Sequence, residues 1–163
     1  MLSASNVRSA GGAATYFAVD NYYTKAEADR SGQWIGEGAE RLGLKGQVDA
    51  PAFEAVLRGE LPNGERVGSD KQYHRAGTDL TFSLPKSWSL IALVGGDKRI
   101  IEAYRTAVTE TLQWAEKNVA ETRVFSSGKI KAIGTGNLTI GLFQHDTNRN
   151  SEPNVHFHAV AAN

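Results

Sequence analysis

Alternation of hydrophobic and polar residues dominates the last third of the chain, and a period of two residues is typical of β-strands. Turn sequences such as SSGK at residues 126–129 separate the alternating runs. Two similar runs lie earlier, at Leu2–Val7 and at residues 79–84. We therefore expect six strands, of which the four late ones cover residues 122–125, 130–133, 138–145 and 155–161.

Helix signals occupy the stretches between these strands. Ser9 is placed to cap a short helix, and Pro51 stands near the start of another that ends before a glycine. Pro85 opens a third helix, which two glycines terminate. Asp97 is placed to cap the longest helix. We expect this helix because apolar residues recur every three to four positions from there as far as residue 119. We also expect a short helix over residues 34–42 and a long loop over residues 61–77.

These elements predict an α+β fold. In each alternating run one row of side chains is apolar and suited to pack beneath the helices, while the other row is more polar. Leu80 and Phe82, for example, alternate with Asp79 and Thr81. The expected architecture is an antiparallel β-sheet with helices packed on one face and the functional site on the other.

Composition limits the classes of function without choosing among them. Lysine plus arginine and aspartate plus glutamate number 18 each, so the net charge indicates neither a nucleic-acid nor a membrane partner. The absence of cysteine excludes thiol catalysis and thiolate metal sites. No apolar run approaches the ~18 residues of a membrane span, and the first twelve residues lack the apolar segment of a secretory signal. We therefore expect a cytoplasmic protein without membrane insertion.

Three of the four histidines lie within the last twenty residues. His156 and His158 share one face of the last expected strand, opposite its apolar row. If this strand forms a hairpin with residues 138–145, centred between residues 150 and 151, His145 lies opposite His156 with Cβ atoms about 5 Å apart. Three imidazoles would then converge on one patch, and Asp79 is a candidate to stand near them.

Three neutral imidazoles without a thiolate leave coordination positions open, as in catalytic metal sites. Such a metal acts as a Lewis acid on a phosphoryl or carbonyl oxygen. Imidazoles favour zinc, nickel or copper, whereas phosphate chemistry often uses magnesium or manganese, so the residues leave the metal open. They also leave the nucleophile open. Bound water would make a hydrolase, whereas a phenol from Tyr16, Tyr22 or Tyr23 would form a phosphoryl-enzyme ester.

Several motifs together resemble one known family. They are MLSASNVRSAGGAATYF with DNYY after it, the block GTDLTFSLPKS, the run GNLTIGLF and the ending HDTNRNSEPNVHFHAV. In this order, over essentially all 163 residues, they resemble the relaxase domain of F-type conjugative relaxase-helicases, which are histidine-hydrophobe-histidine endonucleases. The resemblance implies that residues 1–163 form a single domain, the N-terminal portion of a relaxase domain that extends further in the family.

The resemblance also implies roles for the residues of the candidate site. His145, His156 and His158 match the metal triad of the family. Asp79 matches the acidic residue that orients a metal-binding histidine or assists the tyrosine proton. Tyr16 matches the first catalytic tyrosine, which attacks the DNA.

A second pair of catalytic tyrosines is matched by Tyr22 and Tyr23. Three other positions depart from the family pattern. Phe17 replaces a second tyrosine next to the first one, Trp88 replaces a smaller apolar residue, and Phe157 stands where threonine is common. Because Phe17 has no hydroxyl, Tyr16 is the main candidate for the first attack.

By this resemblance the protein nicks one DNA strand at a plasmid transfer origin, stays joined to the 5′ phosphate and later rejoins the ends. The resemblance implies one divalent metal ion, Mg²⁺ or Mn²⁺ in function and Zn²⁺ or Ni²⁺ in vitro, with single-stranded origin DNA and accessory relaxosome proteins as partners. Five basic side chains are candidates for phosphate contacts, namely Arg75, Lys86, Lys129, Lys131 and Arg149. Two alternatives stay open, a metal-dependent hydrolase using bound water and a non-catalytic module that binds single-stranded DNA.

Overall fold

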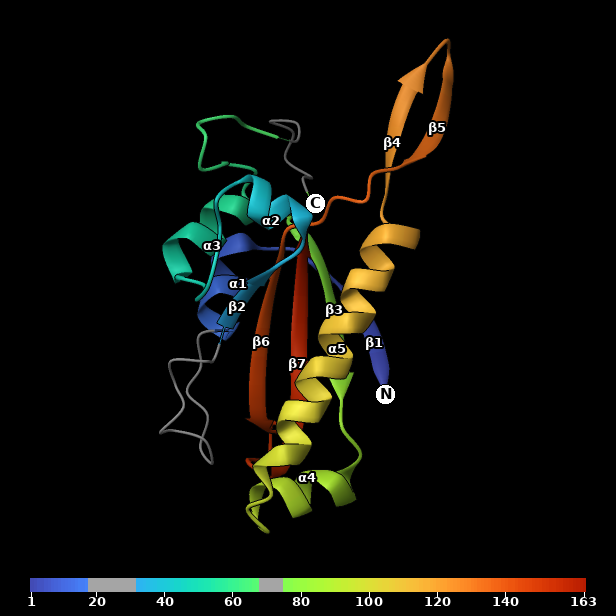
Figure 1. The fold of residues 1–163 in the computed structure, drawn as a ribbon. Coiled ribbons are helices and arrows are strands. Elements are labelled where there is room, and N and C mark those ends of the chain that lie inside the picture. The colour runs from blue at the N-terminus through green and yellow to red at the C-terminus, as the bar shows by residue number, and fades with distance from the viewer. Residues whose placement is uncertain (18–31, 68–74) are drawn as a thin grey trace.

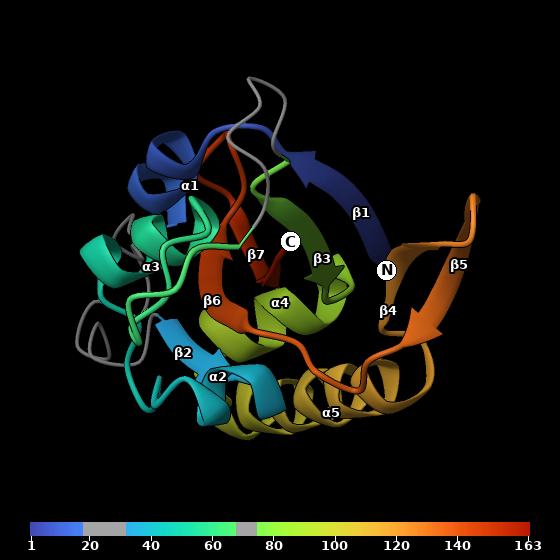
Figure 2. The same ribbon diagram turned by 90° about the horizontal axis from the view of Figure 1, so that it is seen from above.

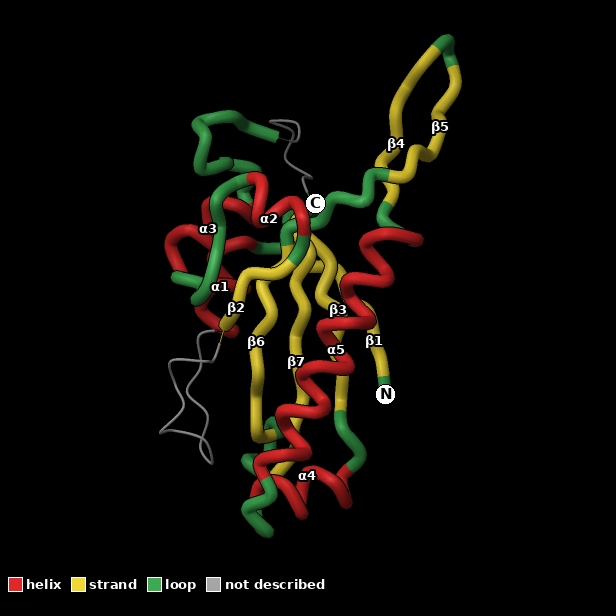
Figure 3. Tube along the Cα trace, viewed as in Figure 1, coloured by secondary structure: helices red, strands yellow, loops and turns green. Residues whose placement is uncertain are grey.

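The computed structural model describes residues 1–17, 32–67 and 75–163, and for residues 14–17 it describes the backbone (Figure 1). Helices and strands alternate irregularly along the chain, as the α+β prediction requires (Figure 3). In chain order the elements are β1 (Leu2–Val7), α1 (Ala10–Phe17), β2 (Gly32–Ile35), α2 (Glu37–Arg41), α3 (Ala50–Leu57), β3 (Gly77–Ser83), α4 (Lys86–Leu93), α5 (Lys98–Asn118), β4 (Glu121–Ser126), β5 (Lys129–Gly134), β6 (Ile140–Thr147) and β7 (Pro153–Ala162).

Within the described residues, five strands form the main antiparallel sheet, in the order β1-β3-β7-β6-β2. Its centre is the β6–β7 hairpin, whose register places His145 directly opposite His156. This confirms the predicted hairpin centre between residues 150 and 151. Nearer the turn a β-bulge shifts the register by one residue, so that Thr147 lies opposite Pro153.

One face of the sheet is covered by α4 and α5, which confirms the prediction that helices pack on the face opposite the histidines (Figures 1 and 2). The apolar rows of β6 and β7 form the centre of this core, where Leu142 and Phe157 are fully buried. Tyr104 of α5 packs its ring 5.7 Å from that of Phe157. Each fully buried side chain of this size contributes roughly 1.5–3 kcal/mol to folding, so these contacts hold the two histidine-bearing strands firmly in place.

A second core lies on the opposite face of the sheet, which the sequence did not predict. There Phe143 and Val160 pack with α1 and α3, and Phe53 of α3 makes an edge-on contact with Phe143 at 4.9 Å between ring centroids. Phe143 shares its face of β6 with His145, because the two residues are two positions apart. The helix α1 therefore covers the same face of the sheet that carries the histidines.

The helix expected over residues 34–42 is shorter than predicted, because its first residues belong to a strand. Trp34 lies in β2 opposite Gly141 of β6, and its side chain is buried in the second core. Gly36 then takes a φ of 106°, a conformation that suits glycine, and the helix α2 begins only at Glu37. The predicted cap residues Ser9 and Asp97 each accept a hydrogen bond from a backbone N–H of the helix that follows. Asp49, a cap that the sequence did not predict, does the same at the start of α3.

The strands β4 and β5 form a separate two-stranded ribbon, which projects away from the main sheet (Figure 1). Every residue of the two strands is exposed, including Phe125 and Ile130, which lie directly opposite each other. The predicted strand positions are thus confirmed, but these strands do not belong to the sheet that carries the histidines.

The buried carboxylate of Glu116 connects α5 to the start of α2 and to the segment that precedes β6. Glu116 is 4 % exposed, and its Oε1 atom accepts hydrogen bonds from the backbone N–H groups of Glu37 at 3.0 Å and Leu138 at 2.6 Å. Hydrogen bonds to charged groups are worth more than neutral ones, so Glu116→Ala is expected to lower the free energy of unfolding by roughly 1.5–3 kcal/mol.

Urea unfolding of the Glu116→Ala variant checks this expectation. The matched control is Glu110→Ala, because Glu110 is exposed on the same helix and should change stability little. Equal stability of the two variants would show that the Glu116 contacts contribute nothing.

Candidate functional site

Three imidazoles converge on the face of the sheet that α4 and α5 leave open. His145 comes from β6, and His156 and His158 come from β7, with 9 %, 8 % and 6 % of their surfaces exposed. Their ring centroids lie 5.0–5.3 Å apart, and one nitrogen of each ring lies within 4.8 Å of the others. Metal–nitrogen bonds of about 2.1 Å at a tetrahedral angle place ligand nitrogens roughly 3.4 Å apart, so side-chain rotations that bring these nitrogens closer together allow all three to bind one ion.

Hydrogen bonds fix the orientation of two of these rings. His156 donates from Nδ1 to the backbone carbonyl of Asn154 at 2.9 Å, and His158 donates from Nδ1 to Asp79 Oδ2 at 2.8 Å. In both rings Nε2 is therefore the nitrogen that carries the lone pair, which is the usual arrangement in histidines that bind a metal. Burial also lowers the pKa of His156, which favours its neutral, metal-binding form.

Asp79 lies beside the histidines, as expected from its place in the polar row of β3. This strand pairs with β7, and the register places Thr81 opposite His158. The carboxyl group of Asp79 is buried, with the residue 7 % exposed, and its Oδ2 atom also lies 3.2 Å from the hydroxyl of Thr81. A buried carboxylate that accepts a hydrogen bond from an imidazole fixes the tautomer of that ring.

The triad opens into a cleft of about 400 Å³. Polar residues from three strands and from the β6–β7 turn line it, which gives a substrate several hydrogen-bonding groups near the imidazoles. Arg149 is the one member of the five predicted DNA contacts that lines this cleft. The other lining residues are Thr81, Ser83, Thr147, Asn148 and Asn154 together with the three histidines.

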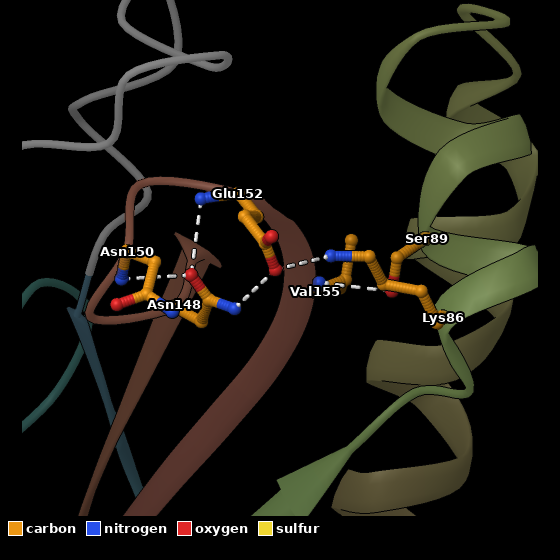
Figure 4. A network of polar contacts seen from close by, with 6 residues as sticks. All are labelled: Lys86, Ser89, Asn148, Asn150, Glu152 and Val155. Carbon is orange, nitrogen blue, oxygen red and sulfur yellow. Dashed lines mark hydrogen bonds and ion pairs between the residues drawn. The ribbon is translucent and has the colours of Figure 1, made fainter.

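Lys86 lies at the start of α4 and is engaged with the β6–β7 turn (Figure 4). Its ammonium group lies 3.0 Å from Glu152 Oε2, which also accepts a hydrogen bond from Asn148. These two hydrogen bonds lower the pKa of Glu152. The Oδ1 atom of Asn148 accepts from the backbone N–H groups of Asn150 and Glu152, so the network organises the turn that carries Arg149.

The remaining predicted DNA contacts lie outside the cleft. Arg75 precedes β3 and donates to the side chains of Asn6 and Asn163. Lys129 and Lys131 lie on β5, and because they are two positions apart they share one face of the exposed ribbon.

The structure describes only one of the three predicted tyrosines, and only its backbone. Tyr16 belongs to the last turn of α1, which packs against α3 on the histidine face of the sheet, and only its backbone is described. Tyr22 and Tyr23 lie outside the described residues.

Two contacts at the site were not predicted from the sequence. The carbonyl group of Asn154 orients His156, and a backbone group leaves no signal in the side-chain pattern. The hydroxyl of Thr81 contacts Asp79, and its only signal was membership of the polar row of β3. In the described part of the chain, no helix is long and apolar enough to cross a membrane.

The fold and the site together define an α+β protein with a three-histidine centre, in which two of the histidines flank a hydrophobic residue on one strand. The sequence pattern of the TrwC relaxase family matches residues 10–163. The chain belongs to this family.

Known relatives agree in sequence and in structure. The multifunctional conjugation protein TraI of Escherichia coli K12 is 46 % identical over 167 residues, which cover 100 % of this chain and 9 % of TraI. The conjugative relaxase TrwC in its metal-bound complex with oriT DNA gives a TM-score of 0.86 at 43 % identity, over 100 % of this chain and 57 % of TrwC. A copper-bound complex of TrwC gives 0.87 at 42 % identity, with the same coverage of both chains. The histidine triad and these metal-bound relatives indicate a divalent metal ion at the site.

Proposed function

We propose that this protein nicks and rejoins one strand of DNA at a plasmid transfer origin, through a covalent link between a tyrosine and the 5′ phosphate. One observation supports this most strongly, namely the three imidazoles and the buried Asp79 on one face of a chain that belongs to the relaxase family. The TrwC structures, which hold oriT DNA, support the choice of substrate. The protein acts in the cytoplasm, with accessory relaxosome proteins as further partners.

The three histidines hold one divalent ion in this proposal, and Mg²⁺ or Mn²⁺ is the functional metal. The bound ion supplies positive charge next to the scissile phosphate. Asp79 keeps His158 in the tautomer whose Nε2 atom faces the site, and the carbonyl of Asn154 does the same for His156. The sheet thus presents the ligands already oriented, so little reorganisation is needed when the phosphate arrives.

Tyr16 provides the nucleophile in this proposal. Its phenol oxygen forms a bond to phosphorus while the bond to the 3′ oxygen of the preceding nucleotide breaks. The phenol proton is released, and the leaving oxygen takes up a proton to become a 3′ hydroxyl. A phosphotyrosine ester replaces a phosphodiester, so rejoining the strand needs no ATP. Tyr22 or Tyr23 makes a second, later attack that ends transfer.

Contacts to the DNA backbone follow from the placement of the basic residues. Arg149 lies in the cleft and is suited to contact a phosphate close to the triad. Lys129 and Lys131 share one face of the projecting ribbon and are suited to contact a more distant part of the DNA. Lys86 already pairs with Glu152, and Arg75 with two asparagines, so these two residues contribute less to DNA binding.

A denaturing gel tests the proposed function. The protein is incubated with single-stranded origin DNA and Mn²⁺, and a protein–DNA band that survives denaturation is expected. A hydrolase that uses bound water would cleave the DNA without such a band, and a binding module would shift the DNA only under native conditions. Either result would contradict the proposal.

Asp79→Asn is expected to slow cleavage more than it weakens DNA binding. The amide leaves one fewer acceptor for His158 Nδ1 and removes the charge that favours the correct tautomer. Loss of a group that is hydrogen-bonded to a metal ligand typically lowers metal affinity or activity about 10- to 100-fold. The check is the cleavage rate at saturating DNA, and an unchanged rate would remove Asp79 from the mechanism.

A further inference from the structure

The carboxylate of Asp79 is held by two groups that converge on a single oxygen atom. His158 Nδ1 lies 2.8 Å from Oδ2, and the hydroxyl of Thr81 lies 3.2 Å from the same atom. The other oxygen, Oδ1, is buried and has no hydrogen-bond partner among the described residues. The position of Oδ2, and through it the orientation of the imidazole, therefore depends on two contacts, of which Thr81 supplies one.

The direction of the hydrogen bonds follows from proton counting. A carboxylate oxygen 2.8 Å from a ring nitrogen requires a proton between them, so His158 Nδ1 is the donor. The Thr81 hydroxyl also lies 3.2 Å from that nitrogen, but Nδ1 then has no lone pair to accept its proton. The hydroxyl of Thr81 therefore donates to Asp79 Oδ2.

We propose that Thr81 is a positioning residue of the metal centre, which acts through Asp79 to hold His158 in the orientation and tautomer that bind the ion. The register of the sheet supports this role. Thr81 lies directly opposite His158 across the β3–β7 pair, and Asp79 lies two residues away on the same face. Three side chains on two neighbouring strands thus contact one another. The inference rests on the proposed function, because it presumes that the histidines bind a divalent metal.

Three variants separate the hydroxyl from the rest of the side chain. Thr81→Val keeps the shape of threonine and removes the hydroxyl, whereas Thr81→Ser keeps the hydroxyl and removes the methyl group. Thr78→Val is the matched control, because Thr78 lies on the opposite face of the same strand. Mn²⁺ alone is titrated into each variant by calorimetry, and thermal unfolding without metal is recorded for each.

Thr81→Val is expected to bind Mn²⁺ about tenfold more weakly. This is the lower end of the range found when a group that supports a metal ligand is removed. Thr81→Ser and Thr78→Val are expected to bind as the wild type does. Wild-type affinity in Thr81→Val, or equal losses in Thr81→Ser and Thr81→Val, would overturn the role of Thr81. A wild type that bound no Mn²⁺ would overturn the proposed metal and this role together, so the two failures are distinguishable.

Discussion

Tyr16→Phe is expected to form no covalent DNA adduct, while it binds Mn²⁺ and single-stranded DNA as the wild type does. The change removes one oxygen atom, which is the proposed nucleophile, and keeps the aromatic ring. Phe17 cannot replace it, because its ring carries no hydroxyl. The measurement is the yield of protein–DNA adduct on a denaturing gel, compared with the native binding affinity of the same variant.

Two control variants make this result specific. Tyr104→Phe removes a phenol from α5, on the opposite face of the sheet, where burial raises the pKa of Tyr104 and so favours its protonated form. This variant should form the adduct normally. The double change of Tyr22 and Tyr23 to phenylalanine should also leave the first nicking step largely intact. An adduct in Tyr16→Phe at the wild-type level would contradict the assignment of the nucleophile.

Replacing His145, His156 and His158 by alanine is expected to abolish measurable Mn²⁺ binding. Removing a group that is hydrogen-bonded to a metal ligand typically weakens metal binding about 10- to 100-fold. Removing the ligands themselves should weaken it by more than that. The cleft has no thiolate to take their place, because the chain has no cysteine. Calorimetry with Mn²⁺ measures the affinity, and circular dichroism confirms that the variant is folded. Unchanged affinity in a folded variant would remove the metal from this site.

The register of the central hairpin was predictable from the sequence because strand geometry leaves little freedom. A period of two residues fixes which side chains share a face, and a shift of one residue would place His156 and His158 in the hydrophobic core. The same rule placed Asp79 on the histidine face of β3. It did not establish that β3 neighbours β7, because strand order depends on long-range pairing.

Other features depend on packing that a local pattern does not encode. The apolar residues of α1 and α3 predict a buried face on each helix, but not which face of the sheet they cover. Trp34 lies in too short a segment for helix and strand periods to be distinguished, and its pairing with β6 decides the outcome. The apolar side chains of Phe125 and Ile130 are of a kind usually buried in a sheet, yet they lie on an exposed ribbon.

Mass spectrometry of the nuclease-trimmed adduct identifies the residue that attacks the DNA. The wild-type protein is reacted with single-stranded origin DNA and Mn²⁺, the bound DNA is digested, and the protein is cleaved into peptides. We expect a remnant nucleotide linked through its 5′ phosphate to Tyr16. A remnant on Tyr22 or Tyr23, or cleaved DNA without any modified tyrosine, would contradict this assignment.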